Sequence, residues 1–347
     1  MVNDSVPSVR IPHVSKEHKD LRENDPIALG LVNSLSLLQC DRIVESAWLQ
    51  HVPFGFWLIS ALNPNRIVEL GVHRGASLTA FCQASHHLEL KPEIVGVDTW
   101  EGDAHTGSYG EEILDDLAKY VSRFDFPVRL LRQRFVEAHR AIDDGSIDLL
   151  HIDGLHTYSA VEEDYRMWLP KMSTRGVIIF HDINVYERDF GVHRLWRELS
   201  WQYPSFEFLH GHGLGVLAVG NEPAPLISKL ASLRTNQFST ETVRSAYHNL
   251  GLSVSRSYEI SLRLNAELTD TKIIRYMVSP EVGNLELLRS RMIELEQRAD
   301  CLKDKNLKLE EEVSRMNVEL CSAISQHQRK RDVLRRHLRR IQQKIKT

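Results

Sequence analysis

Apolar residues along the middle of the chain follow two alternating patterns. Short apolar runs bounded by glycine, proline or charged residues are typical of buried parallel strands, whereas apolar residues that recur every three or four positions are typical of amphipathic helices. The alternation favours an α/β fold with a mostly parallel sheet. The predicted strands cover residues 67–70, 93–98, 128–131, 146–153 and 176–180.

The region that follows these strands has a different pattern. A helix is predicted over 192–203, and apolar runs at 206–209 and 214–219 flank a Gly-His-Gly turn. The spacing of the two runs is typical of a β-hairpin. We therefore expect one domain over 51–220, in which the parallel sheet ends in an antiparallel hairpin.

The sequence on either side of this domain is predicted to be helical. Residues 1–50 form an N-terminal extension with a leading helix, in which Leu31, Leu35 and Leu38 recur at helical spacing. The leading helix would cover a sheet edge or a ligand site, with simple packing as the alternative. Residues 221–280 are predicted to be a helical connector that is interrupted by prolines.

A heptad pattern occupies residues 281–328. Apolar side chains dominate its a and d positions, and Asn306 at an a position favours a parallel, in-register pair of helices. The pattern therefore predicts a coiled coil that makes the chain a homodimer, although the charges at the e and g positions support this register only in part. The a positions are Leu285, Met292, Ala299, Asn306, Val313 and Leu320, and the d positions are Leu288, Leu295, Leu302, Leu309, Met316 and Ala323.

Residues 329–347 form a basic amphipathic tail. The tail contains nine Lys or Arg residues and one Asp. An apolar stripe beside these cations suits an anionic membrane surface, and a solvated extension of the coiled coil is the alternative. The stripe consists of Leu334, Leu338, Ile341 and Ile345.

Charge and cysteine usage narrow the class of protein. The net charge is −4 although the tail is strongly basic, so the rest of the chain is acidic and no nucleic-acid-binding core is expected. No apolar run approaches the ~18 residues of a membrane-spanning helix. The four cysteines lack metal or redox spacing. We expect a cytoplasmic protein with reduced thiols, peripheral to the inner face of a membrane if the tail binds lipid.

A glycine turn joins the first predicted strand to the helix that follows it. Glu69 stands two residues before Gly71, and Gly75 follows four residues later. A dinucleotide fingerprint needs G-x-G-x-x-G, so this turn disfavours pyrophosphate, whereas the acid suits an ammonium group. The pattern resembles motif I of class I S-adenosylmethionine-dependent methyltransferases. The resemblance implies that Glu69 holds the methionine amino group and that both glycines let the backbone approach the cofactor. A plain strand-to-helix turn is the alternative.

Further cofactor contacts are predicted after the second and third strands. Asp98 lies at the distance beyond the glycine turn at which an acid can bind ribose hydroxyls, with a helix cap or a local hydrogen bond as the alternative. Trp100, in a long loop, would cover the nucleoside or act as a surface lid. Phe135 begins a short helix near the expected position of the adenine.

The most specific motif runs from His151 to Pro170 and continues at residues 175–182. It contains I-D-G-x-H-x-Y, an acid and a tryptophan on the next predicted helix, and a His-Asp pair. It resembles a family of bacterial class I methyltransferases associated with surface-glycan biosynthesis, over roughly residues 66–219. The resemblance implies a Rossmann-like methyltransferase sheet, S-adenosylmethionine as cofactor and a sugar or glycan acceptor.

Acidic and imidazole side chains follow two neighbouring predicted strands. Asp153 ends one strand and His181-Asp182 ends the next, so these groups should converge at the carboxyl edge of the sheet. They could hold Mg²⁺ or another divalent cation that acidifies a sugar hydroxyl. His156 is placed to accept the hydroxyl proton. A helix cap for Asp153 and packing or capping for His156 are the alternatives.

Two positions depart from the family pattern. Leu155 stands where an acid is frequent, and Arg175 replaces one glycine of a Gly-Gly pair. Leu155 removes one candidate metal ligand or base. A metal-free reaction with His156 as base therefore stays open, because the sulfonium is already a good leaving group and positioning supplies much of the catalysis.

The sequence thus predicts an S-adenosylmethionine-dependent O-methyltransferase that acts on a sugar hydroxyl of a surface glycan or glycolipid precursor. Two alternatives stay open. One is a dimeric coiled-coil scaffold with a degenerate methyltransferase-like domain, and the other is a metal-dependent hydroxylase of the same fold. The joint presence of Glu69, Asp98, Asp153 and the His181-Asp182 pair argues against degeneration.

Overall fold

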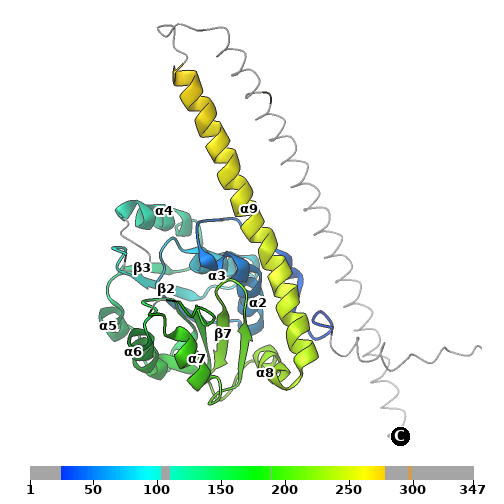
Figure 1. The fold of residues 1–347 in the computed structure, drawn as a ribbon. Coiled ribbons are helices and arrows are strands. Elements are labelled where there is room, and N and C mark those ends of the chain that lie inside the picture. The colour runs from blue at the N-terminus through cyan, green and yellow to red at the C-terminus, as the bar shows by residue number, and fades with distance from the viewer. Residues whose placement is uncertain (1–24, 103–109, 188, 278–296, 298–347) are drawn as a thin grey trace, which may run out of the picture.

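The computed structural model describes residues 25–102, 110–187, 189–277 and residue 297. Within these ranges the strands form one seven-stranded sheet of order β3-β2-β1-β4-β5-β7-β6 (Figure 1). Neighbours from β3 to β5 pair in parallel, and β7 is antiparallel to both β5 and β6. The strands are β1 (Arg66–Leu70), β2 (Glu93–Asp98), β3 (Val128–Arg132), β4 (Ile147–Ile152), β5 (Met172–His181), β6 (Ser205–Phe208) and β7 (Leu214–Ala218). The predicted parallel sheet with a terminal antiparallel hairpin is confirmed.

The strand order reverses between β1 and β4, which pair directly. Connections from β1 run through β2 to β3 in one direction, and those from β4 run through β5 in the other. In open α/β sheets, ligands bind at the carboxyl ends of the strands beside this reversal. The glycine turn after β1 and the acid after β4 therefore lie at the expected ligand-binding edge.

Helices cover both faces of the sheet. One face packs against α2 (Val52–Leu62), α3 (Ala76–His87), α4 (Glu111–Val121), α8 (Pro225–Ser232) and the start of α9 (Gln237–Met277). The other face packs against α5 (Phe135–Ala138), α6 (Tyr158–Trp168) and α7 (Val192–Leu199). The 3₁₀ helices are η1 (Ser34–Leu37), η2 (Ala47–His51), η3 (His139–Ala141), η4 (Leu169–Lys171) and η5 (Leu233–Thr235).

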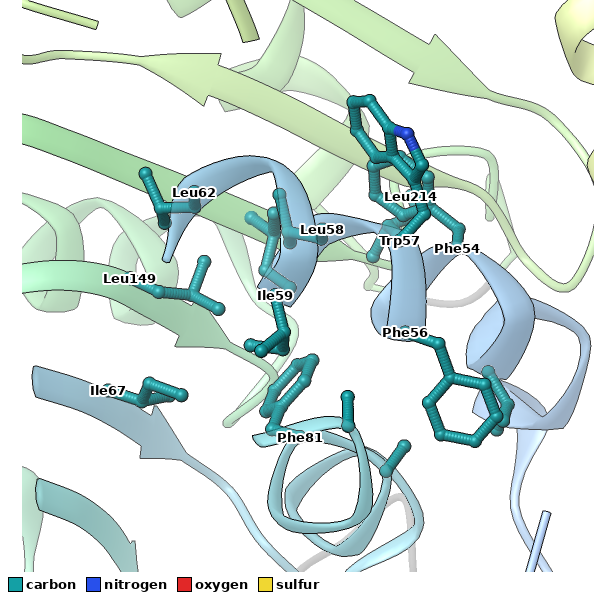
Figure 2. Close-up of a cluster of buried hydrophobic side chains, with 14 of the residues drawn as sticks. Phe54, Phe56, Trp57, Leu58, Ile59, Leu62, Ile67, Phe81, Leu149 and Leu214 are labelled. Atoms are coloured by element: carbon teal, nitrogen blue, oxygen red, sulfur yellow. The ribbon is translucent and has the colours of Figure 1, made fainter. Parts of the chain in front are cut away.

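The α2 helix forms the centre of the first face. It carries apolar residues on all sides, which is typical of a helix that is buried all round. Figure 2 shows Leu58, Ile59 and Leu62 of α2 beside Phe81 of α3 and Leu149 of β4. Each of these side chains has no exposed surface. This packing fixes α3, and with it the glycine turn, against the sheet.

The structure differs from the prediction before α2 and after β7. Apart from short 3₁₀ helices, the described residues before α2 are turns, and Pro53 lies in the first turn of α2, where its missing N–H costs nothing. The predicted connector begins with α8 and the first half of α9, which belong to the body. Val243 and Tyr247 are buried in the core, and the Tyr247 hydroxyl donates to the Leu31 carbonyl at 2.7 Å.

Beyond the body, α9 projects away from the sheet domain (Figure 1). The predicted coiled coil and basic tail, residues 281–328 and 329–347, lie outside the described residues apart from residue 297. They stay predictions from the sequence.

Candidate functional site

The glycine turn after β1 is shaped by its neighbours. Gly71 has a φ of 86°, and a Cβ there would overlap the backbone carbonyl of Asp153. Gly75 has a φ of 77° and precedes α3, and a Cβ there would lie 2.6 Å from Leu117 of α4. Both positions therefore need glycine for the backbone conformation and for close packing. Their approach to a cofactor stays a prediction.

Asp98 ties the glycine turn to the end of β2. Its Oδ2 accepts hydrogen bonds from the backbone N–H groups of Val72 and His73 at 2.9 and 2.8 Å, and its Oδ1 accepts from Trp100 N–H at 2.7 Å. These are the local hydrogen bonds that the sequence left as an alternative. Because a carboxylate oxygen has two lone pairs, Oδ1 keeps capacity for a ribose hydroxyl. The predicted ribose contact stays a prediction.

Trp100 is part of the core. Its side chain is 1% exposed, and the indole Nε1–H donates to the His73 carbonyl at 3.0 Å. The interpretation of Trp100 as a surface lid is therefore wrong, because a lid needs an exposed side chain. The indole instead holds the glycine turn through the His73 carbonyl. Its predicted contact with the nucleoside stays a prediction.

Glu69 is completely buried on β1. Its Oε1 accepts a hydrogen bond from Ser77 Oγ at 2.7 Å, and Oε2 lies 3.4 Å from Nδ1 of the equally buried His151 on β4. Burial raises the pKa of Glu69, although His151 and Ser77 oppose the rise. The carboxylate thus faces the core of α2 and α3, and its predicted contact with the methionine amino group stays a prediction.

Phe135 and Gly154 come together at the ends of β3 and β4. A Cβ on Gly154 would lie 2.5 Å from the Phe135 ring and 3.5 Å from Oδ2 of Asp164 on α6. Phe135 therefore lies beside the turn after β4, and its predicted contact with an adenine stays a prediction. Asp164 is buried in the same place, and burial followed by the charge of Glu163 raises its pKa to about 7.

The predicted acidic and imidazole groups converge at the carboxyl edge. Nδ1 of His181 lies 3.2 Å from Asp153 Oδ1 and 3.5 Å from Asp182 Oδ1. One ligand atom from each of these three side chains fits within 4.8 Å of the others. Asp182 has a φ of 60°, a conformation that is strained for a residue other than glycine and is frequent at functional sites. The prediction that these residues meet is confirmed.

Charge pairing decides the protonation of this cluster. Burial alone would lower the pKa of His181, but the charges of Asp153 and Asp182 raise it to about 9. Burial alone would raise the pKa of Asp153, but the charge of His181 holds it well below its usual range. Asp153 keeps 21% of its side chain exposed, so this ion pair faces the outside of the sheet.

His156 joins the same cluster from the turn before α6. Its Nδ1 lies 3.3 Å from Asp182 Oδ2, and its ring stacks on Phe190 with centroids 4.7 Å apart. The carboxylate can orient the ring and stabilise the imidazolium that forms when His156 accepts a proton. The packing alternative and the role as base are therefore compatible. The role as base stays a prediction.

Three groups at this edge were not predicted from the sequence. The Gly211 carbonyl lies 3.0 Å from His181 Nε2 and 2.9 Å from Nε2 of the buried His51. Nδ1 of His212 lies 3.2 Å from Asp182 Oδ1. The available signal was the Gly-His-Gly turn, whose three residues all have positive φ. His51 had none, because it reaches the site only through the packing of α2.

The cluster has the chemistry of a divalent-cation site. Carboxylate oxygens suit hard cations, and imidazole can complete the donor set. The His181 Nε2–H can donate to the Gly211 carbonyl, as the second nitrogen of a metal-ligating histidine usually does. Nδ1 faces the two carboxylates, and a cation bound there would take the place of the Nδ1 proton. Asp153, His181 and Asp182 therefore fit a bound metal ion.

The two departures from the family pattern occupy different environments. Leu155 is exposed on the turn after β4 and contributes no ligand. Arg175 donates from Nη2 to the carbonyl of Leu62, the last residue of α2. A cation at a helix C-terminus satisfies an unpaired carbonyl and complements the helix dipole. Arg175 is thus explained by the packing of α2.

Comparison with known proteins agrees with this geometry. Residues 68–183 match the family model described as a methyltransferase domain. This segment runs from β1 to the loop after β5, and it contains the glycine turn, Asp98, Asp153 and the His181-Asp182 pair. About a third of the chain is thus similar to a methyltransferase domain.

An uncharacterized protein of Sinorhizobium fredii, y4gI, is 48% identical to this chain over 192 residues. The match covers 55% of this chain but only 21% of the relative. The chain therefore spans about a fifth of the length of that relative.

Solved structures of methyltransferases are also similar to the chain. A putative caffeoyl-CoA O-methyltransferase from Staphylococcus aureus is 16% identical, with a TM-score of 0.39, over 59% of this chain and 98% of that one. The Podospora anserina methyltransferase PaMTH1, bound to SAH, is 13% identical, with a TM-score of 0.32, over 74% and 88%. Similarities this weak say nothing about the reaction or the acceptor.

Among the residues that the structure describes, no helix is both long enough and apolar enough to cross a membrane.

Proposed function

We propose that this protein is an S-adenosylmethionine-dependent O-methyltransferase that acts on a sugar hydroxyl of a surface glycan or glycolipid precursor. The observation that carries the proposal is the meeting of the glycine turn with Asp153, His181 and Asp182 at the edge where the strand order reverses. The match of this region to a methyltransferase domain supports it.

The chain's own residues divide into a cofactor side and an acceptor side. On the cofactor side, Asp98 holds the turn of Val72 and His73 in place and offers Oδ1 to the ribose. When bound, S-adenosylmethionine supplies an activated methyl group on a sulfonium leaving group. In-line positioning of the acceptor against that group then accounts for much of the rate.

On the acceptor side, His156 accepts the proton of the sugar hydroxyl, and Asp182 stabilises the imidazolium that results. Asp153, His181 and Asp182 would hold a divalent cation, which supplies Lewis acidity toward the hydroxyl. The charge that builds up on the acceptor oxygen is thereby opposed at the open end of β4 and β5.

The proposal assigns dimerisation and membrane binding to the segments that follow α9. We expect residues 281–328 to dimerise the chain and residues 329–347 to hold it at an anionic membrane surface, because each surface cation contributes about 1 kcal/mol there. A chain truncated after Pro280 should be monomeric by light scattering. A chain truncated after Gln328 should remain a dimer that no longer sediments with anionic liposomes.

The deciding experiment is calorimetric titration of the full-length protein with S-adenosylmethionine and S-adenosylhomocysteine. Binding of both, followed by transfer of a labelled methyl group to a saccharide, is the expected result. A scaffold with a degenerate domain binds neither. Activity that disappears with a chelator and returns with Mg²⁺ supports the cation, whereas chelator-resistant activity supports the metal-free form with His156 as base.

A further inference from the structure

A cavity lies beside the candidate active site, at the β6 edge of the sheet. Its volume is about 530 Å³, and its walls come from the loop after β5, from α7, from edge strand β6 and from the start of α9. None of the residues discussed above as cofactor or catalytic groups lines it. The cavity is therefore separate from the groups assigned to the candidate active site.

One end of the cavity lies at the same edge of the sheet as the candidate active site. Ile183 and Asn184 line it and directly follow Asp182. Because β6 runs parallel to β5, Leu209 after β6 lies at the carboxyl edge as His181 does, and it also lines the cavity. From β5 across β7 to β6 is roughly 10 Å at the usual strand spacing. A ligand reaching from Asp182 into the cavity must therefore be longer than one sugar ring.

Aromatic side chains stand exposed at this cavity. Trp201 is 77% exposed and Tyr186 is 64% exposed, and both line it. The Arg234 guanidinium lies over the Trp201 ring, 4.3 Å from its centroid, and donates from Nη1 to the Ser200 carbonyl. An exposed indole held in this way offers a flat apolar surface on which a sugar ring can pack.

The arginines that line the cavity differ in whether they form ion pairs. Arg244 is neutralised by Glu207 at 3.0 Å and by Glu241 at 2.9 Å. Arg197 and Arg234 also line the cavity, and neither forms an ion pair within the described part of the chain. Two arginines of the cavity lining are thus not neutralised by an ion pair within the described residues, and guanidinium forks suit phosphate or carboxylate oxygens.

We propose that this cavity is a subsite for an anionic saccharide, in which Trp201 packs on a sugar ring and Arg197 and Arg234 bind its phosphate or carboxylate. The inference rests on the proposed function, because it assigns the substrate class of that enzyme. The acceptor is then an extended, charged glycan. One sugar occupies the cavity while the hydroxyl of another reaches His156 and Asp182.

The test uses full-length protein and three probes, namely glucose 1-phosphate, glucuronic acid and neutral methyl glucoside, titrated by ligand-observed NMR. Changing both arginines, as Arg197→Gln with Arg234→Gln, should weaken binding of an anionic probe by about tenfold or more, because charged hydrogen bonds are lost. Trp201→Ala should weaken all three probes. The phosphate and the carboxylate probe separate the two possible sources of the negative charge.

Arg194→Gln is the matched control, since Arg194 is on the same helix but lies over Tyr158 and not at the cavity. It should bind every probe as the unchanged protein does. All variants should keep their affinity for S-adenosylhomocysteine and their melting temperature. Arg197→Lys with Arg234→Lys, which retains the charge, should recover part of the binding.

Failure of this inference differs from failure of the proposed function. Full-length protein that binds S-adenosylhomocysteine but none of the anionic probes, or whose anionic binding survives the double arginine change, overturns the cavity proposal alone. Protein that binds the probes through these arginines but never binds S-adenosylhomocysteine overturns the methyltransferase proposal and leaves a saccharide-binding cavity.

Discussion

Two carboxylate–imidazole pairs, one on β4 and one just after it, differ in their exposure to solvent. His151 faces Glu69 in the sealed core, and both side chains have no exposed surface. Asp153, just beyond the end of β4, faces His181 and keeps 21% of its side chain exposed. Each pair joins a carboxylate to an imidazole, and His151 and Asp153 stand only two positions apart in the chain. Their place along the strand decides whether the pair is closed inside the protein or open to a ligand.

The pKa values follow this difference. Burial raises the pKa of Glu69 in spite of the nearby His151, so its ionised form is disfavoured. At the edge, burial also acts on Asp153, but the charge of His181 outweighs it and the pKa is lowered. In the sealed pair, burial thus opposes ionisation of the carboxyl, while in the open pair the Asp153 carboxylate stays ionised beside His181.

The largest expected effect concerns turnover at the open pair. Asp153→Ala and Asp182→Ala should each lower methyl transfer by ~10²–10⁴-fold, because they remove a cation ligand or the partner of the general base. The affinity for S-adenosylhomocysteine, measured by calorimetry, should stay nearly unchanged. Full activity in both variants would remove these residues from the mechanism.

The sealed pair should instead govern stability. His151→Ala leaves Glu69 buried without its imidazole and opens a cavity, so the free energy of unfolding should fall by roughly 3–5 kcal/mol. Asp153→Ala removes one of the two carboxylate partners of His181 but leaves Asp182, so its loss should be smaller than that of His151→Ala. Urea unfolding of both variants makes the comparison. Equal losses would show that the two pairs do not differ as described.

Substitutions of Glu69 and Asp98 test the cofactor side through the affinity for S-adenosylmethionine. Asp98→Ala leaves three backbone N–H groups without their acceptor, so it should weaken S-adenosylmethionine binding by roughly 1–3 kcal/mol. Glu69→Ala should weaken binding by a similar amount if the ammonium group reaches this carboxylate. Glu69→Gln, which can still accept from Ser77, separates that contact from simple loss of packing. Unchanged affinity in Asp98→Ala and Glu69→Ala alike contradicts the cofactor site.

The last comparison concerns a buried carboxyl outside these two pairs. The pKa of Asp164 is raised to about 7, first by burial and then by Glu163, from an ordinary value of 3.8. Between these two values the folded protein keeps a proton that the unfolded chain has released, so stability falls as the pH rises through this window.

Asp164→Asn removes this pH dependence. Relative to the unchanged protein, its free energy of unfolding should improve steadily from about pH 4 to pH 8, by at most about 4 kcal/mol. Chemical unfolding at several pH values measures the two slopes, with Glu163→Gln as the neighbouring control that should shift the midpoint only slightly. Parallel slopes for Asp164→Asn and the unchanged protein would contradict the assignment.

Much of the site was predictable because it depends on strand ends. Asp153 and the His181-Asp182 pair each end a strand whose apolar run is visible in the sequence, and parallel strands bring their carboxyl ends to one edge. Leu155 and Arg175 were visible as departures. The contact of Arg175 with the end of α2 was not predictable, because it depends on how that helix crosses the sheet.

Contacts between distant segments could not be predicted from the sequence. His51 meets His181 only because α2 packs against the hairpin, with ring centroids 5.6 Å apart. Trp100 was predicted to cover the nucleoside or to act as a surface lid, yet its side chain is buried and its indole donates to the His73 carbonyl. The cavity at Trp201 joins α7, β6 and α9, which no local pattern brings together.

The sequence by itself determined the order of strands and helices, the glycine turn and the residues that end each strand, because these depend on periodicity and on local backbone preference. Only the tertiary structure decided which acids are sealed and which are open. The structure shows that Glu69 faces His151 and Ser77 and that Asp98 binds backbone N–H groups of the glycine turn, and the predicted cofactor contacts of both acids stay predictions. Burial and charge pairing decide the chemistry of a carboxylate, and both are set by neighbours that are distant in the chain.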